Sequence, residues 1–283
     1  MVNSCLDCFA CNDHMEQYCE NGTIYTYNSL DKYEDSSPTY GGYSTHIVTR
    51  QEFVCSIPDN LEFSIAAPLL CAGITLYSPI KRYAGLEGGK TIGIVGLGGI
   101  GHMGIKILKA LGHSVLVMST SERKREKAME LGVDHFVIVN DETEIDPEFY
   151  RTCDAVLDTA AIHHDIRKYF KVLKYQGNYV CIGAPKIPYE VGFFNLLCIN
   201  LCCSLIGGIE ETQEMLEFCS EHEIHPEIEI ISGDQINRAM EELIGRSNDK
   251  ARFVIDVSTI DGREIAPLST SSSTGEEAEQ KEA

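Results

Sequence analysis

The sequence predicts an α/β fold built on a doubly wound parallel sheet. Ile92–Val95 is a short apolar run that suits a strand buried on both faces, and a glycine-rich turn and a helical pattern follow it. Further strand and helix patterns then alternate as far as residue 206. This alternation favours parallel strands, because each helix carries the chain back across the sheet before the next strand begins.

The glycine-rich turn has the spacing G-x-G-x-x-G. Its members are Gly96, Leu97, Gly98, Gly99, Ile100 and Gly101. In this pattern the first glycine permits a tight bend, the second lets a pyrophosphate touch the backbone, and the third lets the helix pack closely on the strand. The helix that begins here offers unpaired N–H groups to phosphates. Strand, turn and helix in this order predict a dinucleotide site, and a purely structural turn is the alternative.

The second strand of this unit, Val115–Met118, ends in hydroxyl residues that precede a group of cations. They are Ser119, Thr120 and Ser121, with Arg123, Lys124 and Arg125 just beyond. An NAD site normally has an acid about 20 residues after the glycines, bonded to a ribose hydroxyl. No acid stands at residues 118–121, and hydroxyls beside a cation suit a 2′-phosphate. We therefore expect NADP(H); a helix N-cap at Ser121 beside a solvated basic face is the alternative.

Four cysteines near the start of the chain have the spacing of a metal site. They are Cys5, Cys8, Cys11 and Cys19, with gaps of two, two and seven residues. Four thiolates close a tetrahedral Zn²⁺ site and leave no position for a substrate, so this zinc is expected to be structural. The rival is an iron–sulfur cluster, whose bacterial pattern needs a three-residue gap before the fourth cysteine and a proline after it. Neither feature is present.

The remaining patterns extend the alternation. We expect β structure from 39 to 57, helix over 62–83 and 121–131, strands over 136–139 and 155–158, and a helix to about residue 174. Strands over 179–182, 202–206, 228–231 and 252–257, with helices over 210–222 and 234–244, complete the chain. Thr159, Gly183, Ser204, Leu205 and Ile206 stand at or near strand ends, where parallel sheets bind ligands. We expect them to line the nicotinamide half of the cofactor. The alternative is that these residues only mark the places where strands end and loops begin.

Charge and composition limit the classes of partner that the protein is expected to bind. The net charge is −20, which argues against nucleic acid and membrane surfaces, since both attract basic proteins. No apolar run approaches the roughly 20 residues of a membrane span and no secretion signal opens the chain, so a cytoplasmic protein is expected. Residues 261–283 are rich in Ser, Thr, Glu and Ala, which predicts a disordered acidic tail.

Several separated motifs together resemble the zinc-containing medium-chain alcohol dehydrogenases, in the branch of the cinnamyl alcohol dehydrogenases. They are the cysteine quartet, Thr39–Ser44, Pro68–Thr75, the glycine turn, Ser119–Ser121 and Arg252–Asp256. The resemblance implies a partial β-rich, GroES-like catalytic domain at 1–71 that carries the structural-zinc lobe. It further implies an NADP-binding Rossmann domain at 72–207, a return segment of the catalytic domain at 208–260, and the tail at 261–283.

The activity implied by this resemblance is reversible hydride transfer between NADP(H) and a primary alcohol–aldehyde pair, in a homodimer. Thr75 and Lys124 would then be cofactor contacts, and Cys71 would be one of three protein ligands of a catalytic zinc. The family's other two ligands come from an early Cys-His motif and a Gly-His-Glu motif, which this sequence lacks. Relative to the family, the chain is therefore expected to be N-terminally truncated and impaired as a catalyst.

Two other functions fit parts of the sequence. One is a non-enzymatic NADP(H)-binding or regulatory protein, which the missing zinc ligands favour. The other is a zinc-free enone reductase on the same nucleotide-binding core, against which the quartet Cys5, Cys8, Cys11 and Cys19 counts.

Overall fold

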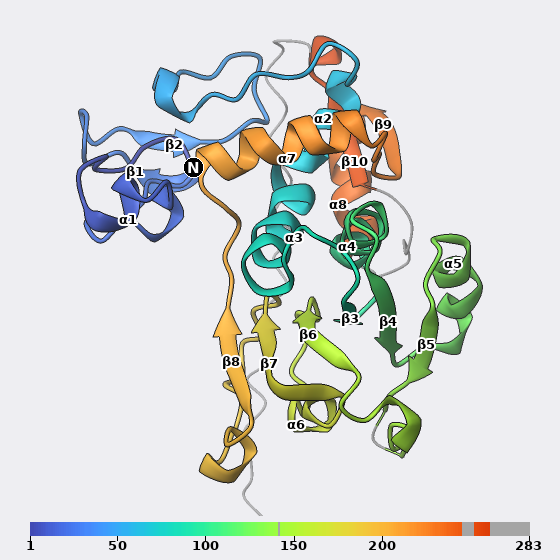
Figure 1. Ribbon diagram of the computed structural model, residues 1–283. Helices are drawn as coiled ribbons and strands as arrows, with labels where there is room; N and C mark the ends of the chain where they lie inside the picture. Colours follow the sequence, from blue (N-terminus) through green and yellow to red (C-terminus); the bar gives the residue numbers. More distant parts are fainter. Residues whose placement is uncertain (141, 245–251, 261–283) are drawn as a thin grey trace, which may run out of the picture.

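The largest element of the computed structural model is a six-stranded parallel sheet (Figure 1), and the structure describes residues 1–140, 142–244 and 252–260. The strands are β3 (Thr91–Val95), β4 (Ser114–Ser119), β5 (His135–Ile138), β6 (Cys153–Asp158), β7 (Leu173–Cys181) and β8 (Ile199–Cys203). They lie in the order β5-β4-β3-β6-β7-β8. This is the strand order of a Rossmann sheet, in which the chain changes direction between β3 and β6. The predicted doubly wound α/β fold is confirmed.

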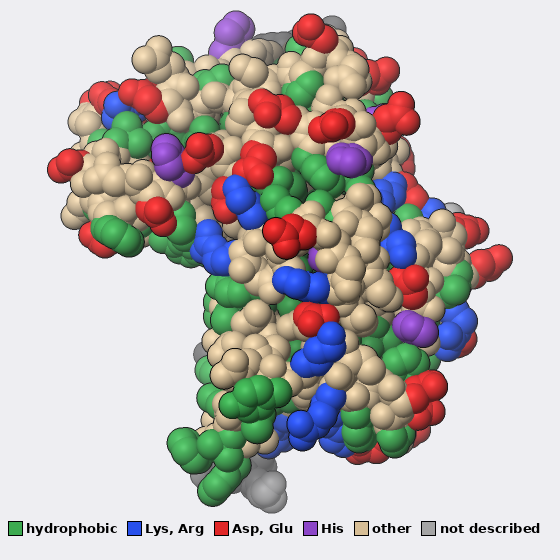
Figure 2. All heavy atoms as spheres, in the orientation of Figure 1, with side chains coloured by type: hydrophobic (Ala, Val, Ile, Leu, Met, Phe, Trp, Pro, Cys, Tyr) green, Lys and Arg blue, Asp and Glu red, His purple; other side chains and the backbone are tan. Residues whose placement is uncertain are grey.

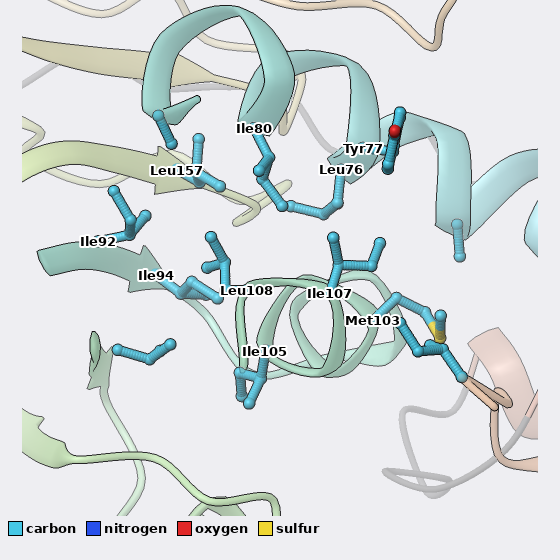
Figure 3. Packing of buried hydrophobic residues seen from close by; sticks show 14 of the residues in the cluster. Leu76, Tyr77, Ile80, Ile92, Ile94, Met103, Ile105, Ile107, Leu108 and Leu157 are labelled. Carbon is cyan, nitrogen blue, oxygen red and sulfur yellow. The ribbon is translucent and has the colours of Figure 1, made fainter. Parts of the chain in front are cut away.

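Helices and loops cover both faces of this sheet. The α-helices of the described residues are α1 (Phe9–Asn12), α2 (Phe63–Pro68), α3 (Ile74–Pro79), α4 (Gly99–Ala110), α5 (Arg125–Glu130), α6 (Arg167–Phe170), α7 (Ile209–Glu221) and α8 (Ile236–Ile244). On one face, Ile92 and Ile94 of β3 pack against Leu76 of α3 and Leu108 of α4 (Figure 3). A second apolar cluster, which includes Val156 of β6 and Tyr169 of α6, lies on the opposite face.

A continuous helix from Phe63 to Ala84 runs through α2 and α3, with one π-helical segment between them and another after α3. By length and composition this helix could cross a membrane, so the expectation that no apolar run approaches that length is wrong. Two thirds of its most apolar stretch (67%) is buried inside the protein, where α3 packs against α4 and α7. Burial in the core accounts for an apolar helix of this length.

Four further strands form two small sheets. β1 (Tyr27–Leu30) and β2 (Pro38–Tyr40) are antiparallel, whereas β9 (Ile228–Ser232) and β10 (Arg252–Asp256) are parallel. The expectation of β structure from 39 to 57 is wrong after Tyr40. Beyond that residue the segment is a loop with one 3₁₀ turn at Gln51–Phe53, because no neighbouring strand of the described residues pairs with it.

The helix expected to run from Thr159 to about residue 174 is also much shorter than predicted. Residues 160–165 form a loop, α6 is a single turn, and β7 already begins at Leu173. The loop packs the His164 side chain against Asp158 of β6, which leaves few residues for a helix. The six strands of the large sheet fall within the range 72–207, and the predicted tail 261–283 lies outside the described residues.

Candidate functional site

The glycine turn connects β3 to the first turn of α4, and each glycine has a distinct steric role. Gly96 has a φ of +85°, in the left-handed region that glycine tolerates. A Cβ on Gly101 would lie 2.4 Å from the carbonyl oxygen of Gly96, so the helix approaches the strand this closely only with glycine. A Cβ on Gly98 would meet no protein atom within 4 Å. Gly98 therefore presents bare backbone to open space, as a pyrophosphate site requires.

Two side chains from neighbouring strand ends hold the turn. The Thr159 hydroxyl, directly after β6, lies 2.9 Å from the carbonyl oxygen of Val95 and 3.1 Å from that of Gly96. The Lys124 ammonium, beyond the end of β4, donates to the carbonyl oxygen of Leu97 at 2.9 Å. A positive charge therefore lies at the turn, beside the place where phosphates would bind.

The hydroxyl cluster begins at the last residue of β4. Ser119 is buried, and its hydroxyl accepts a hydrogen bond from the Ser121 N–H at 3.2 Å, while Thr120 is exposed. Not all of the cations beyond it join this cluster. The Arg125 guanidinium pairs with Glu122 and donates to the carbonyl oxygen of Phe136 at 3.0 Å, so it is held away from the turn.

Arg252 is a further site residue that no local pattern in the sequence indicates. This first residue of β10 lies against the glycine turn, since a Cβ on Gly99 would be 3.3 Å from the Arg252 Nε atom. Arg252, Gly98 and Thr159 line one pocket of about 450 Å³, which β9, α8 and Tyr43 close. Arg252 lies far from the glycine turn in the sequence, and only the fold brings β10 back to the turn. The local sequence therefore does not reveal this residue.

The residues predicted to line the nicotinamide half lie at one edge of the sheet. Gly183 follows β7 and Ser204 follows β8, beside Thr159 after β6. The Gly183 N–H donates to the carbonyl oxygen of Asp158 at 2.9 Å, and the Ser204 N–H donates to that of Cys181 at 3.0 Å. A Cβ on Gly183 would lie 2.0 Å from the carbonyl oxygen of Ala160, so these segments are in close contact.

A buried carboxylate that the sequence argument did not identify holds the loop after Thr159. Asp158 accepts hydrogen bonds from the Tyr179 hydroxyl at 2.9 Å and from the Ala160 N–H at 3.1 Å. The Nε2 atom of His164 lies 3.1 Å from the same carboxylate. Burial alone would lower the pKa of His164, but the neighbouring Asp158 outweighs it and raises this pKa. The network fixes the loop beside the cofactor edge.

Cys71, the predicted ligand of a catalytic zinc, lines a second pocket of about 960 Å³. Leu205 and Ile206 line the same pocket, so the structure brings Cys71 to the nicotinamide side. Tyr43 lines both pockets, which therefore adjoin. No second cluster of three metal-binding side chains occurs among the described residues, so these residues do not fit a catalytic zinc. Thr75 is buried within α3, and no hydrogen bond among the described residues joins it to the turn.

The cysteine quartet fits a structural zinc. The Sγ atoms of Cys5, Cys8, Cys11 and Cys19 all lie within 4.8 Å of one another. Three of the separations are 3.5, 3.9 and 4.0 Å, close to the ~3.8 Å between sulfurs that lie ~2.3 Å from one tetrahedral ion. The Cys8 N–H donates to the Cys5 sulfur at 3.3 Å, and the Glu20 N–H to the Cys8 sulfur at 3.4 Å.

The lobe formed by this quartet docks on the cofactor edge. The Leu205 N–H donates to the Tyr18 hydroxyl at 3.0 Å, and the Ile209 N–H donates to the Glu16 carboxylate at 3.1 Å. A Cβ on Gly208 would lie 1.8 Å from the carbonyl oxygen of His14, so the two segments touch through backbone alone. The metal lobe therefore supports the segment that follows β8.

The glycine turn lies open at the carboxyl edge of a Rossmann sheet, and a closed four-thiolate lobe docks beside it. Together these two features define the class of protein. It is a dinucleotide-binding oxidoreductase with a structural metal lobe.

Comparison with known proteins gives the family. The zinc-binding dehydrogenase profile matches residues 99–221. A probable formaldehyde dehydrogenase AdhA of Bacillus subtilis is 44% identical over 261 residues, covering 92% of this chain and 73% of that protein. A cinnamyl alcohol dehydrogenase (SbCAD4) of Sorghum bicolor superposes with a TM-score of 0.87 and 37% identity, over 93% of this chain and 75% of that chain. The CAD of Helicobacter pylori complexed with NADP(H) superposes with a TM-score of 0.81 and 37% identity, over 91% of this chain and 73% of that chain. The chain therefore belongs to the zinc-binding dehydrogenases, as an oxidoreductase of the alcohol dehydrogenase type.

Proposed function

We propose that this chain is an NADP(H)-dependent alcohol dehydrogenase or aldehyde reductase that acts on a primary alcohol–aldehyde pair. One observation carries the proposal: Lys124 reaches the glycine turn from the end of β4, beside the hydroxyls of Ser119 and Ser121. A cation and hydroxyls at this place suit a 2′-phosphate, whereas an acid would suit the free ribose hydroxyl of NAD. The relative from Helicobacter pylori, solved with NADP(H), is consistent with this choice.

The residues of the chain bind and orient the cofactor. The Gly98 backbone and the N-terminus of α4 would hold the pyrophosphate, with Arg252 adding a positive charge at Gly99. Thr159, Gly183 and Ile206 would hold the nicotinamide end near Cys71. The bound cofactor supplies or accepts the hydride.

Among the described residues, Cys71 belongs to no cluster of three metal-binding side chains, and three protein ligands are the rule for a catalytic zinc. We therefore expect these 283 residues to bind NADP(H) and to oxidise alcohols weakly. The same observation favours the second candidate, a non-enzymatic NADP(H)-binding protein. The number of zinc ions per chain, measured by metal analysis, distinguishes one structural ion from two ions. Two zinc ions per chain would count against the second candidate.

Lys124→Ala is the most selective test of the cofactor assignment. Loss of one charged contact to the 2′-phosphate should raise the Kd for NADPH by about tenfold and the Kd for NADH by less than about twofold. Fluorescence titration measures both constants. Lys171→Ala is the matched control, because this lysine pairs with Glu144 at the surface. Equal losses for the two cofactors would contradict a phosphate contact at Lys124.

We also propose a homodimer joined through β8, the last strand of the sheet order. Its neighbouring turn exposes Phe193 and Phe194 by 74% and 82%, and Figure 2 shows hydrophobic side chains gathered at this end of the molecule. An open strand edge beside exposed apolar groups favours pairing with a second chain.

Phe194→Glu should weaken this dimer, since a charge would be buried between the two copies. Sedimentation velocity should show a shift towards monomer for Phe194→Glu and none for Phe9→Glu, an equally exposed phenylalanine on the metal lobe. A protein that is already monomeric before substitution would contradict the proposed dimer.

A further inference from the structure

Two thiols outside the sites described above lie next to each other at the carboxyl ends of β7 and β8. Cys181 and Cys203 are the last residues of these strands and are partners in the parallel register. Neighbouring strands lie ~4.8 Å apart, within the Cα separation of ~4.4–6.8 Å that a disulfide spans. Partners in register point to the same face of a sheet, so the two side chains lie side by side.

The surroundings of the pair distinguish the two thiols. Cys203 is exposed, and Cys181 is half-buried against Tyr179 and Tyr189. Burial raises the pKa of Cys181 to about 12, with further contributions from Cys203 and Asp158. Cys202, the next residue along β8, packs into the cluster on the opposite face. An oxidant therefore reaches Cys203 first, and Cys181 is the neighbouring thiol on that face.

We propose that Cys181 and Cys203 form an oxidisable dithiol pair, whose disulfide displaces the strand ends that carry the nicotinamide side of the cofactor site. The oxidant is hydrogen peroxide. It transfers one oxygen to the Cys203 sulfur, giving a sulfenic acid and one water. The Cys181 thiol then gives up its proton and its sulfur attacks the Cys203 sulfur, so that the S–S bond forms and the sulfenic oxygen leaves, with that proton, as a second water. Two thiols thus lose two electrons and two protons, and one peroxide becomes two waters.

The effect on the cofactor site follows from how little free space these strand ends have, and this half of the inference rests on the proposed function. The carbonyl oxygen of Cys181 accepts from the Ser204 N–H, and Gly183 lies against Ala160 with no room for a Cβ. A disulfide brings two Cβ atoms to ~3.8 Å, about 1 Å closer than the strand spacing. Gly183 and Ser204 should shift with them, and the nicotinamide end should lose contacts.

The test uses the zinc-loaded full chain, treated with hydrogen peroxide and then digested without reductant for mass spectrometry. A peptide linked through Cys181 and Cys203 should appear in the parent protein and in Cys202→Ser, and should be missing in Cys203→Ser. NADPH titration should show a Kd about tenfold higher after oxidation, restored by dithiothreitol and unchanged in Cys203→Ser. Zinc content, measured in parallel, shows that the quartet stays intact.

Absence of this linked peptide would overturn the pair, and so would linkage of Cys203 to any other cysteine. A linked protein that binds NADPH as before would overturn the effect on the strand ends. The proposed function is judged separately, on the reduced protein. If reduced protein fails to bind NADPH, the cofactor assignment is wrong, while the peptide map still decides the pair.

Discussion

Gly98→Val should abolish tight NADPH binding and leave the protein folded. The new side chain would enter open space, since even a Cβ at Gly98 would meet no protein atom within 4 Å. That space is where the pyrophosphate must touch the backbone, so the Kd for NADPH should rise by about 100-fold or more. The Tm should change little, because no packed group is disturbed.

Two other glycine variants should behave differently from Gly98→Val. Gly192→Val is the control, since its Cβ would meet only the Asn195 side chain, at 3.3 Å, and Gly192 lines neither pocket; it should change the Kd by less than about threefold. Gly101→Ala should instead impair folding, because its Cβ would lie 2.4 Å from the Gly96 carbonyl oxygen. Unchanged NADPH binding by Gly98→Val would mean that the phosphates do not lie on this turn.

Cys11→Ser should release the structural zinc and lower the Tm by about 10 °C. A structural zinc couples its binding energy to folding, and the loss of one of four thiolates removes most of that energy. Cys11 is buried in the lobe and its Sγ atom lies 3.9 Å from that of Cys5, so a serine oxygen at this position cannot replace the fourth sulfur ligand. Metal analysis and thermal unfolding should change together.

The same variant should also weaken cofactor binding, since the metal lobe holds the segment after β8 through the bond between Tyr18 and the Leu205 N–H. Cys198→Ser, at an exposed thiol outside the quartet, should leave zinc content, Tm and NADPH affinity unchanged. A Cys11→Ser protein that keeps its zinc would contradict the four-thiolate site. One that loses zinc without losing NADPH affinity would contradict the support of the cofactor edge by the lobe.

Local patterns in the sequence were sufficient for the sheet, the glycine turn and the cysteine quartet. Gly96, Gly98 and Gly101 carry their roles in their spacing, and so do the four thiols, because each set is contiguous in the chain. The β pattern after Tyr40 gave a wrong prediction, since a strand needs a neighbouring strand that the local sequence does not reveal.

The missed residues share one physical cause, which is that long-range packing creates their roles. Arg252 reaches Gly99 only because β10 returns to the turn, and Asp158 becomes a fixed acceptor only because Tyr179 and His164 surround it. The juxtaposition of Cys181 with Cys203 likewise depends on strand register. Sequence spacing alone contains none of these contacts.

We propose that this chain binds NADP(H) through its glycine turn and the hydroxyl–lysine cluster beyond it. Isothermal titration calorimetry of the zinc-loaded, reduced protein with NADPH and then with NADH tests it most directly. We expect about one NADPH site per chain, with an affinity at least about tenfold above that for NADH. No heat of binding with NADPH, or tighter binding of NADH, would contradict it.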